Sequence, residues 1–182
     1  MAVVAAGGAN LTNEKVAYRR GAHREKSQRR ERFHQRAAHL RTLPQDNDSY
    51  GLIHNDAHGG NFLLHNNRLI LFDFFDCLYS WYVNDIAIVL FYVLVGIPGA
   101  ERQTFAHRFL RHFLQGYRQE NQLDPIWLFE IPYFLKLREL DTYGLTLYNQ
   151  IDDWWTARYM PGRKHNIEND IPYVELDIAS LM

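Results

Sequence analysis

A short polar stretch, HNDAHGGN, runs from His54 to Asn61 between two runs of apolar residues. A carboxylate on a tight loop, such as Asp56, can accept a hydroxyl proton and orient the oxygen toward a phosphate. The side-chain amide of Asn61 offers an oxygen, the ligand type that Mg²⁺ prefers. A second carboxylate, Asp73, follows a segment that reads as a hairpin and would return the chain to the same place. These residue types predict phosphoryl transfer to a hydroxyl group.

A different chemistry could use the same segment. Asp56 and His58 form a D-x-H pair, and Asp73 and Asp76 form a D-x-x-D pair, the kind of pairs from which a two-metal phosphoesterase site can be built. Such a site would also need a downstream G-N-H-[DE] segment, for which His165-Asn166 is a poor substitute. The phosphoesterase is therefore the weaker interpretation.

The elements that must position these residues are short strands. YGLIH (50–54), Phe62–Leu64 and RLILFDF (68–74) read as strands, with a turn at 65–67. Asparagine tolerates the left-handed backbone that such a turn requires. The polar stretch is thus predicted to lie on a loop that leads into a small β-hairpin, with Asp73 at the far end.

Helices surround this cluster in the prediction. A helix is expected over 23–43, then from Asp85 to about Gly96, from Glu101 to Gln119, and once or twice within 124–160. Residues 1–22 lack periodicity and are expected to be poorly ordered, and the tail from Gly162 is expected to be extended. The predicted fold class is α+β and mostly helical.

The motif carries a family resemblance. HNDAHGGN resembles the H-x-D-x-H-x-x-N catalytic loop of the aminoglycoside phosphotransferase / choline kinase family, which has a protein-kinase-like fold. LILFDFFDC (69–77) resembles that family's metal-binding strand, and WYVNDIAIVLFY (81–92) its next helix. The resemblance covers roughly residues 35–180 and corresponds to the family's C-terminal lobe.

The resemblance implies a role for each residue. Asp56 would be the catalytic base, Asn61 and Asp73 the Mg²⁺ ligands, and His54, His58 and Asp85 the supports of the loop. Asp76 would either line the acceptor site or cap the next helix, and the cap is favoured. The implied activity is transfer of the γ-phosphate of ATP to a hydroxyl of a small molecule.

The sequence departs from the family pattern in three places. Asn55 stands where the family usually has Gly, and Gly59-Gly60 replaces Pro-Gly. Only 55 residues precede Asp56, and neither Lys15 nor Lys26 lies on a strand-like segment. The expected organisation is therefore residues 23–182 as a C-terminal lobe without its N-terminal nucleotide lobe, and the nucleotide-binding residues stay unknown. The alternative is a truncated, non-catalytic binding module.

Charge is distributed unevenly along the 182 residues. Residues 1–43 hold ten Lys and Arg against three Glu, a net charge of +7, whereas the remainder holds ten against 18 acidic residues, a net charge of −8. The acidic body agrees with a cationic acceptor. Nucleic-acid binding is disfavoured because few aromatic residues interleave the basic run. The basic helix is expected to face water or the acidic body.

The remaining expectations concern the surroundings of the chain. Its longest apolar run, 86–97, is shorter than the roughly 20 residues that span a bilayer, and a single Cys at position 77 fits a reducing compartment. We therefore expect a cytoplasmic protein with no membrane contact. Cleft surface left bare by an absent lobe would be partly apolar, which predicts self-association.

Overall fold

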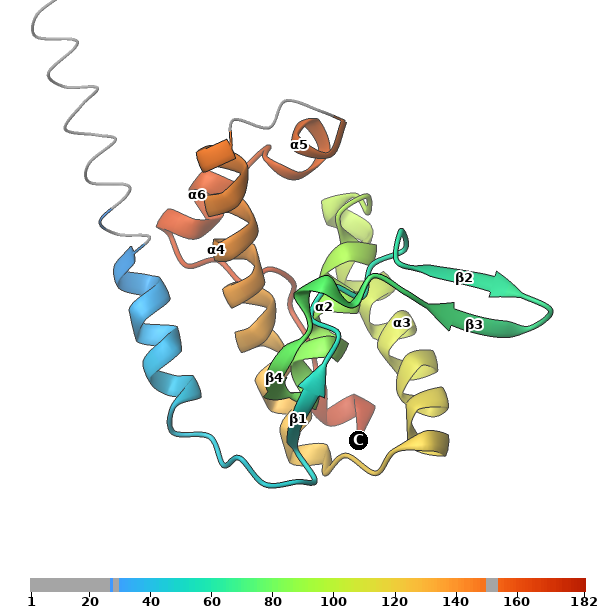
Figure 1. The fold of residues 1–182 in the computed structure, drawn as a ribbon. Coiled ribbons are helices and arrows are strands. Elements are labelled where there is room, and N and C mark those ends of the chain that lie inside the picture. Colours follow the sequence, from blue (N-terminus) through green and yellow to red (C-terminus); the bar gives the residue numbers. More distant parts are fainter. Residues whose placement is uncertain (1–26, 28–29, 150–153) are drawn as a thin grey trace, which may run out of the picture.

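The computed structural model describes residues 27, 30–149 and 154–182, and it confirms a mostly helical α+β fold (Figure 1). A helix over residues 30–40 comes first. The later elements are β1 (Tyr50–Ile53), β2 (Phe62–His65), β3 (Arg68–Leu71), η1 (Phe74–Asp76), β4 (Leu78–Trp81), α2 (Tyr82–Leu94), α3 (Gly99–Glu120), η2 (Pro125–Glu130), α4 (Ile131–Asn149), α5 (Trp154–Tyr159), α6 (Arg163–Glu168) and η3 (Ile178–Leu181), where η denotes a 3₁₀ helix. The predicted segment 1–22 lies outside the described residues.

The strands form two separate antiparallel pairs. β2 and β3 make the predicted hairpin, whose turn residues Asn66 and Asn67 both have left-handed backbones, with φ of 50° and 58°. β1 instead pairs with β4, a strand that the sequence analysis missed. The predicted third strand ends early, at Leu71, because the chain turns into η1 at Phe74. The hairpin projects from the helical body in Figure 1.

The core lies between the long helices. The apolar run of the sequence forms α2, which begins at Tyr82 rather than at Asp85 and packs against both α3 and α4. Seven of its side chains are at most 1% exposed. Because α2 is buried on most sides, its sequence is apolar almost throughout. Among the described residues, no helix is long and apolar enough to cross a bilayer.

The C-terminal tail is more ordered than predicted. It contains α6 and η3 instead of a purely extended segment. Tyr173 is 4% exposed, stacks on Phe91 with ring centroids 4.7 Å apart, and donates its hydroxyl to the Phe91 carbonyl. The tail therefore completes the core around α2.

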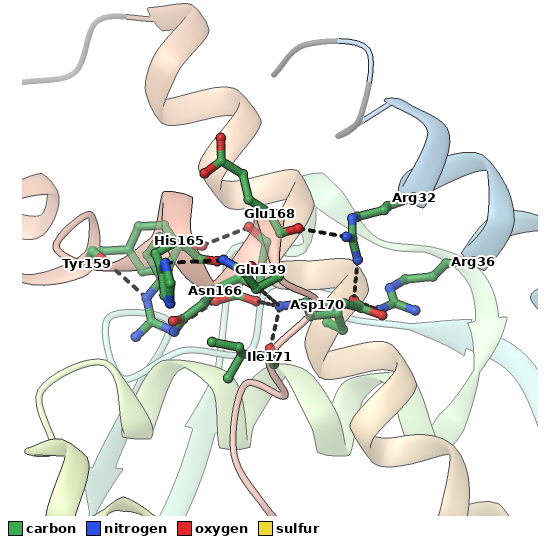
Figure 2. Close-up of polar contacts among 12 residues, drawn as sticks. Arg32, Arg36, Glu139, Tyr159, His165, Asn166, Glu168, Asp170 and Ile171 are labelled. Carbon is green, nitrogen blue, oxygen red and sulfur yellow. Dashed lines mark hydrogen bonds and ion pairs between the residues drawn. The ribbon is translucent and has the colours of Figure 1, made fainter. Parts of the chain in front are cut away.

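A buried ionic cluster fixes the tail to α4 (Figure 2). Glu139, fully buried, accepts from Lys136 Nζ at 2.6 Å and from Arg163 Nη1 at 2.9 Å. Lys136 also donates to the carbonyls of Asn166 and Ile171. Every charge in the cluster is paired, which is the condition under which buried charges are tolerated.

The basic helix at 30–40 docks onto this tail. Arg32 and Arg36 both contact the Asp170 carboxylate, at 3.0 and 2.6 Å, and Arg32 donates to the Glu168 carbonyl (Figure 2). His39, on the same face of the helix, lies 2.8 Å from Glu130. In the described part of the helix, three basic side chains thus face acidic groups of the body.

Candidate active site

Asp56 lies at the centre of the polar loop between β1 and β2. Its Oδ1 accepts a hydrogen bond from the Tyr92 hydroxyl at 2.8 Å and another from Arg138 Nη2 at 2.6 Å. Its Oδ2 lies 3.3 Å from Asn61 Nδ2 and 3.4 Å from His58 Nε2. The carboxylate is one-fifth exposed, so it is accessible at the surface while the two short hydrogen bonds to Oδ1 fix its orientation.

Asn61 joins this loop to the hairpin. Its Nδ2 donates to the backbone carbonyl of Asp56 at 2.9 Å, and the side chain as a whole is 6% exposed. Its own carbonyl accepts from the amide of Phe72 at 3.0 Å. Asp73 follows Phe72 in the chain, so this backbone hydrogen bond at the base of the hairpin brings Asp73 beside Asn61.

Asp73 has an unusual backbone. Its φ of 62° and ψ of 65° are left-handed, a conformation that costs energy in a non-glycine residue. Its side chain is exposed and caps no helix, although it precedes η1. The Asp73 carboxylate thus lies exposed to solvent where the chain leaves the hairpin after β3.

Asp76 does not act as the helix cap that the sequence analysis favoured. It lies within η1 and is exposed, while α2 begins six residues later with Trp81 at its N-cap and no side-chain cap. β4 intervenes between Asp76 and the helix, and the sequence analysis missed that strand. Only the acceptor-lining role stays open as a prediction.

Asp85, in the first turn of α2, holds the start of the polar loop in place. Its two carboxylate oxygens accept the backbone amides of His54 and Asn55, each at 2.8 Å. Asn55 has a left-handed backbone, with φ of 63°, at the position where the related family usually carries glycine. Burial raises the pKa of the Asp85 carboxyl above its usual value, although these backbone hydrogen bonds oppose the rise.

The two loop histidines are used within the loop. His54, 5% exposed, donates from Nε2 to the Phe72 carbonyl at 2.9 Å and accepts the Asp56 amide at Nδ1. His58 accepts the Gly60 amide at Nδ1, which leaves its Nε2 facing Asp56. A Cβ at Gly60 would lie 2.7 Å from the His58 ring, so a side chain at this position would displace that ring.

Tyr92 and Arg138 are members of the site that the sequence analysis did not single out. Tyr92 lies two helical turns after Asp85 on α2, a spacing that places both on one face. Burial raises the pKa of the Tyr92 hydroxyl to about 12, so it is a hydrogen-bond donor at neutral pH. Arg138 comes from α4, where it is one of several charged residues, so the sequence carried no local signal that set it apart.

The donor set suits a hard divalent cation. Because Asn61 Nδ2 is turned to Asp56, the amide oxygen points away from that loop, and Asp73 supplies an exposed carboxylate nearby. Mg²⁺ takes few protein oxygens and keeps several waters. Among the described residues, no group of three or more His, Cys, Asp or Glu side chains could hold a metal ion, so a site here would consist of the amide and carboxylates together with water.

Comparisons with known proteins agree with this arrangement. The sequence profile of the phosphotransferase enzyme family matches residues 8–123. Amicoumacin kinase of Bacillus subtilis (strain 168) is 41% identical over 150 residues, which cover 79% of this chain and 44% of the relative.

Two solved structures are similar in fold. An amicoumacin kinase in complex with AMP-PNP, Ca²⁺ and Ami superposes with a TM-score of 0.78 and 38% identity, over 86% of this chain and 48% of that one. A microcompartment-associated aminopropanol kinase has a TM-score of 0.55 and 21% identity, over 80% of this chain and 45% of that one, and supports the fold alone. The chain spans less than half the length of each of these relatives. The family profile matches most of the chain, and the fold superposes on that of an amicoumacin kinase, so this protein belongs to the phosphotransferase enzyme family.

Proposed function

We propose that this chain carries the hydroxyl-activating and metal-binding half of an ATP-dependent small-molecule kinase. The observation that carries the proposal is the interlocked loop, in which Asn61 donates to Asp56 while its backbone pairs beside Asp73. One loop and one hairpin thereby bring together the proposed base and the two proposed oxygen ligands. The similarity to an amicoumacin kinase bound to AMP-PNP and Ca²⁺ supports nucleotide and divalent-metal use.

In the proposed reaction, Asp56 accepts the proton of the acceptor hydroxyl and directs its oxygen at the γ-phosphate. Asn61 and Asp73 would hold Mg²⁺, which would neutralise charge on the phosphates of the substrate ATP. His54 and Asp85 keep the loop in place, because they tie its backbone to Phe72 and to α2. The protein thus contributes mainly orientation, as a loose phosphoryl-transfer transition state requires.

The acceptor is proposed to be a small hydroxyl compound that carries a cationic group, with amicoumacin as the first candidate. The relative's name supplies the candidate, and the net charge of −8 beyond residue 43 supports a cation. Asp76, exposed beside the hairpin base, is proposed to line the acceptor site. The proposed compartment is the cytoplasm, because ATP and Mg²⁺ are abundant in it.

We propose that polypeptide corresponding to the unmatched half of the relatives supplies the remaining nucleotide contacts. Without it, ATP should bind this chain far more weakly than a complete enzyme binds it. The hairpin exposes Leu63, Leu64 and Leu69 by 59, 74 and 64%. Exposed apolar side chains on both faces of the hairpin favour association, so the chain by itself is proposed to self-associate.

Calorimetric titration with ATP and Mg²⁺ tests the metal assignment. Weak, Mg²⁺-dependent ATP binding is expected in the wild type and in the control Asp48→Ala. This control removes an exposed carboxylate just before β1, outside the polar loop that carries Asp56. The same binding should be lost in Asp73→Ala, because a ligand of the metal is missing. Equal binding by Asp73→Ala and Asp48→Ala would contradict the assignment, and so would binding that does not depend on Mg²⁺.

A further inference from the structure

The guanidinium of Arg138 makes the shortest contact of the candidate base. Its Nη2 donates to Asp56 Oδ1 at 2.6 Å and to the Tyr92 hydroxyl at 2.7 Å, while that hydroxyl donates to the same Oδ1 at 2.8 Å. The three groups form a closed triangle. Arg138 is 15% exposed and Asp56 20% exposed, so solvent weakens this pair less than it weakens a surface ion pair.

The two oxygens of the Asp56 carboxylate are therefore unequal. Oδ1 holds two short hydrogen bonds, one of them from a cation. Oδ2 has only longer contacts, 3.3 Å from Asn61 Nδ2 and 3.4 Å from His58 Nε2. A charge-assisted bond of 2.6 Å is among the strong ones, whereas contacts beyond 3.2 Å are weak. Oδ2 is thus the oxygen with capacity left to accept a proton.

Arg138 is itself firmly held. Its guanidinium carbon lies 5.3 Å from the centre of the Tyr92 ring, within range of a cation–π contact. Its Nη1 lies 3.9 Å from Asp141 Oδ2, one turn along α4. The opposite side of the same helix is pinned by the buried Lys136–Glu139 pair. A group anchored in this way can impose an orientation on its partner.

We propose that Arg138, with Tyr92, is a positioning residue that fixes Asp56 through Oδ1 so that Oδ2 receives the proton of the acceptor hydroxyl. The inference rests on the proposed function. In the step it serves, the hydroxyl proton passes to Oδ2 and the acceptor oxygen bonds to the γ-phosphorus of ATP. The bond from that phosphorus to the β,γ-bridging oxygen breaks, and its electron pair leaves with ADP.

Orientation is the main contribution of the protein in this reaction. In a loose transition state the protein acts chiefly by positioning the nucleophile. A misplacement of about 1 Å can cost about 10²-fold in rate. The clamp on Asp56 therefore acts through geometry.

Three variants test the proposal, with Arg102→Met as the matched control. Arg102 resembles Arg138 closely: its guanidinium also lies 5.3 Å from a tyrosine ring, that of Tyr173, and its Nε is likewise buried without a partner. It does not contact Asp56. Arg138→Met removes the clamp, and Arg138→Lys keeps the charge. Each variant is crystallised, and its turnover is measured with ATP, Mg²⁺ and amicoumacin.

The expected structural result is that the Asp56 side chain leaves its wild-type orientation in Arg138→Met but keeps it in Arg102→Met. The expected kinetic result is a fall in kcat of about 10²-fold in Arg138→Met with little change in KM for ATP, partly rescued in Arg138→Lys. An unmoved Asp56 in Arg138→Met, or a kcat equal to that of Arg102→Met, would overturn the proposal. A wild type that orients Asp56 as described but does not phosphorylate amicoumacin would count against the proposed function, and the crystal structures alone would then decide the role of Arg138.

Discussion

Removal of the Asp85 carboxylate should loosen the loop that carries the candidate base. Asp85→Ala deletes two hydrogen bonds of 2.8 Å and leaves the amides of His54 and Asn55 without their acceptor. Hydrogen bonds to a charged group contribute about 1.5–3 kcal/mol each. The raised pKa of Asp85 shows that burial of the charge offsets part of this gain. We therefore expect a loss of about 3 kcal/mol in the free energy of unfolding.

That loss has a measurable scale. For a protein of this size, about 1 kcal/mol shifts Tm by roughly 2–4 °C, so Asp85→Ala should lower Tm by roughly 6–12 °C. Urea unfolding followed by tryptophan fluorescence gives the free energy directly. Asp85→Asn should fall between, because its amide oxygen can accept one backbone amide while its NH₂ group faces the other.

A second aspartate supplies the control. Asp124→Ala removes one backbone hydrogen bond, from the Ile126 amide at 2.9 Å, at the exposed start of η2. A capping bond of this kind contributes about 1 kcal/mol. If Asp85→Ala cost no more than Asp124→Ala, the claim that Asp85 supports the loop would be refuted.

Three further predictions follow from the same geometry. Asn55→Gly should retain stability whereas Asn55→Ala should lose about 1 kcal/mol in urea unfolding, because the φ of 63° suits glycine and penalises a Cβ; equal values would refute the strain. Tyr92 has a pKa raised by burial to about 12, so it keeps its proton in the folded chain after the unfolded chain loses it near pH 10. Stability should accordingly fall as pH rises from about 10 to about 12, and Tyr92→Phe should flatten that fall; an unchanged slope would contradict it. In sedimentation velocity the wild type should form oligomers, and the cross-strand pair Leu64→Glu with Leu69→Lys should restore a monomer; a wild type that is monomeric at high concentration would count against the apolar hairpin as the cause.

Local signals in the sequence located the hairpin and the candidate base. The Asn66-Asn67 turn, the short strands and the polar loop between them depend on neighbouring residues only, and the structure places them as predicted. Asn61 and Asp73 lie together because a hairpin returns the chain, which is also a local property. Their proximity could therefore be predicted, although their roles rest on the proposal.

Long-range pairing was not predictable in the same way. β4 pairs with β1 across about 30 residues of chain, and the run LYSW carries no alternation that would mark it as a strand. Because β4 was missed, the sequence analysis began the helix too late, at Asp85 instead of Tyr82. For the same reason it favoured Asp76, wrongly, as the cap of that helix. Arg138 reaches Asp56 from a helix 82 positions away, and only packing of α4 on α2 could reveal that contact.

The most direct test of the central claim is transfer of radiolabelled γ-phosphate from ATP to amicoumacin in the presence of Mg²⁺. The wild type and Asp48→Asn, which changes an exposed carboxylate outside the loop, should both label the acceptor. Asp56→Asn keeps the shape of the side chain but accepts a proton poorly, so kcat should fall about 10²–10⁴-fold. Labelling by Asp56→Asn at the wild-type rate, or no labelling by the wild type even at ATP concentrations high enough to offset its weak binding, would contradict the account.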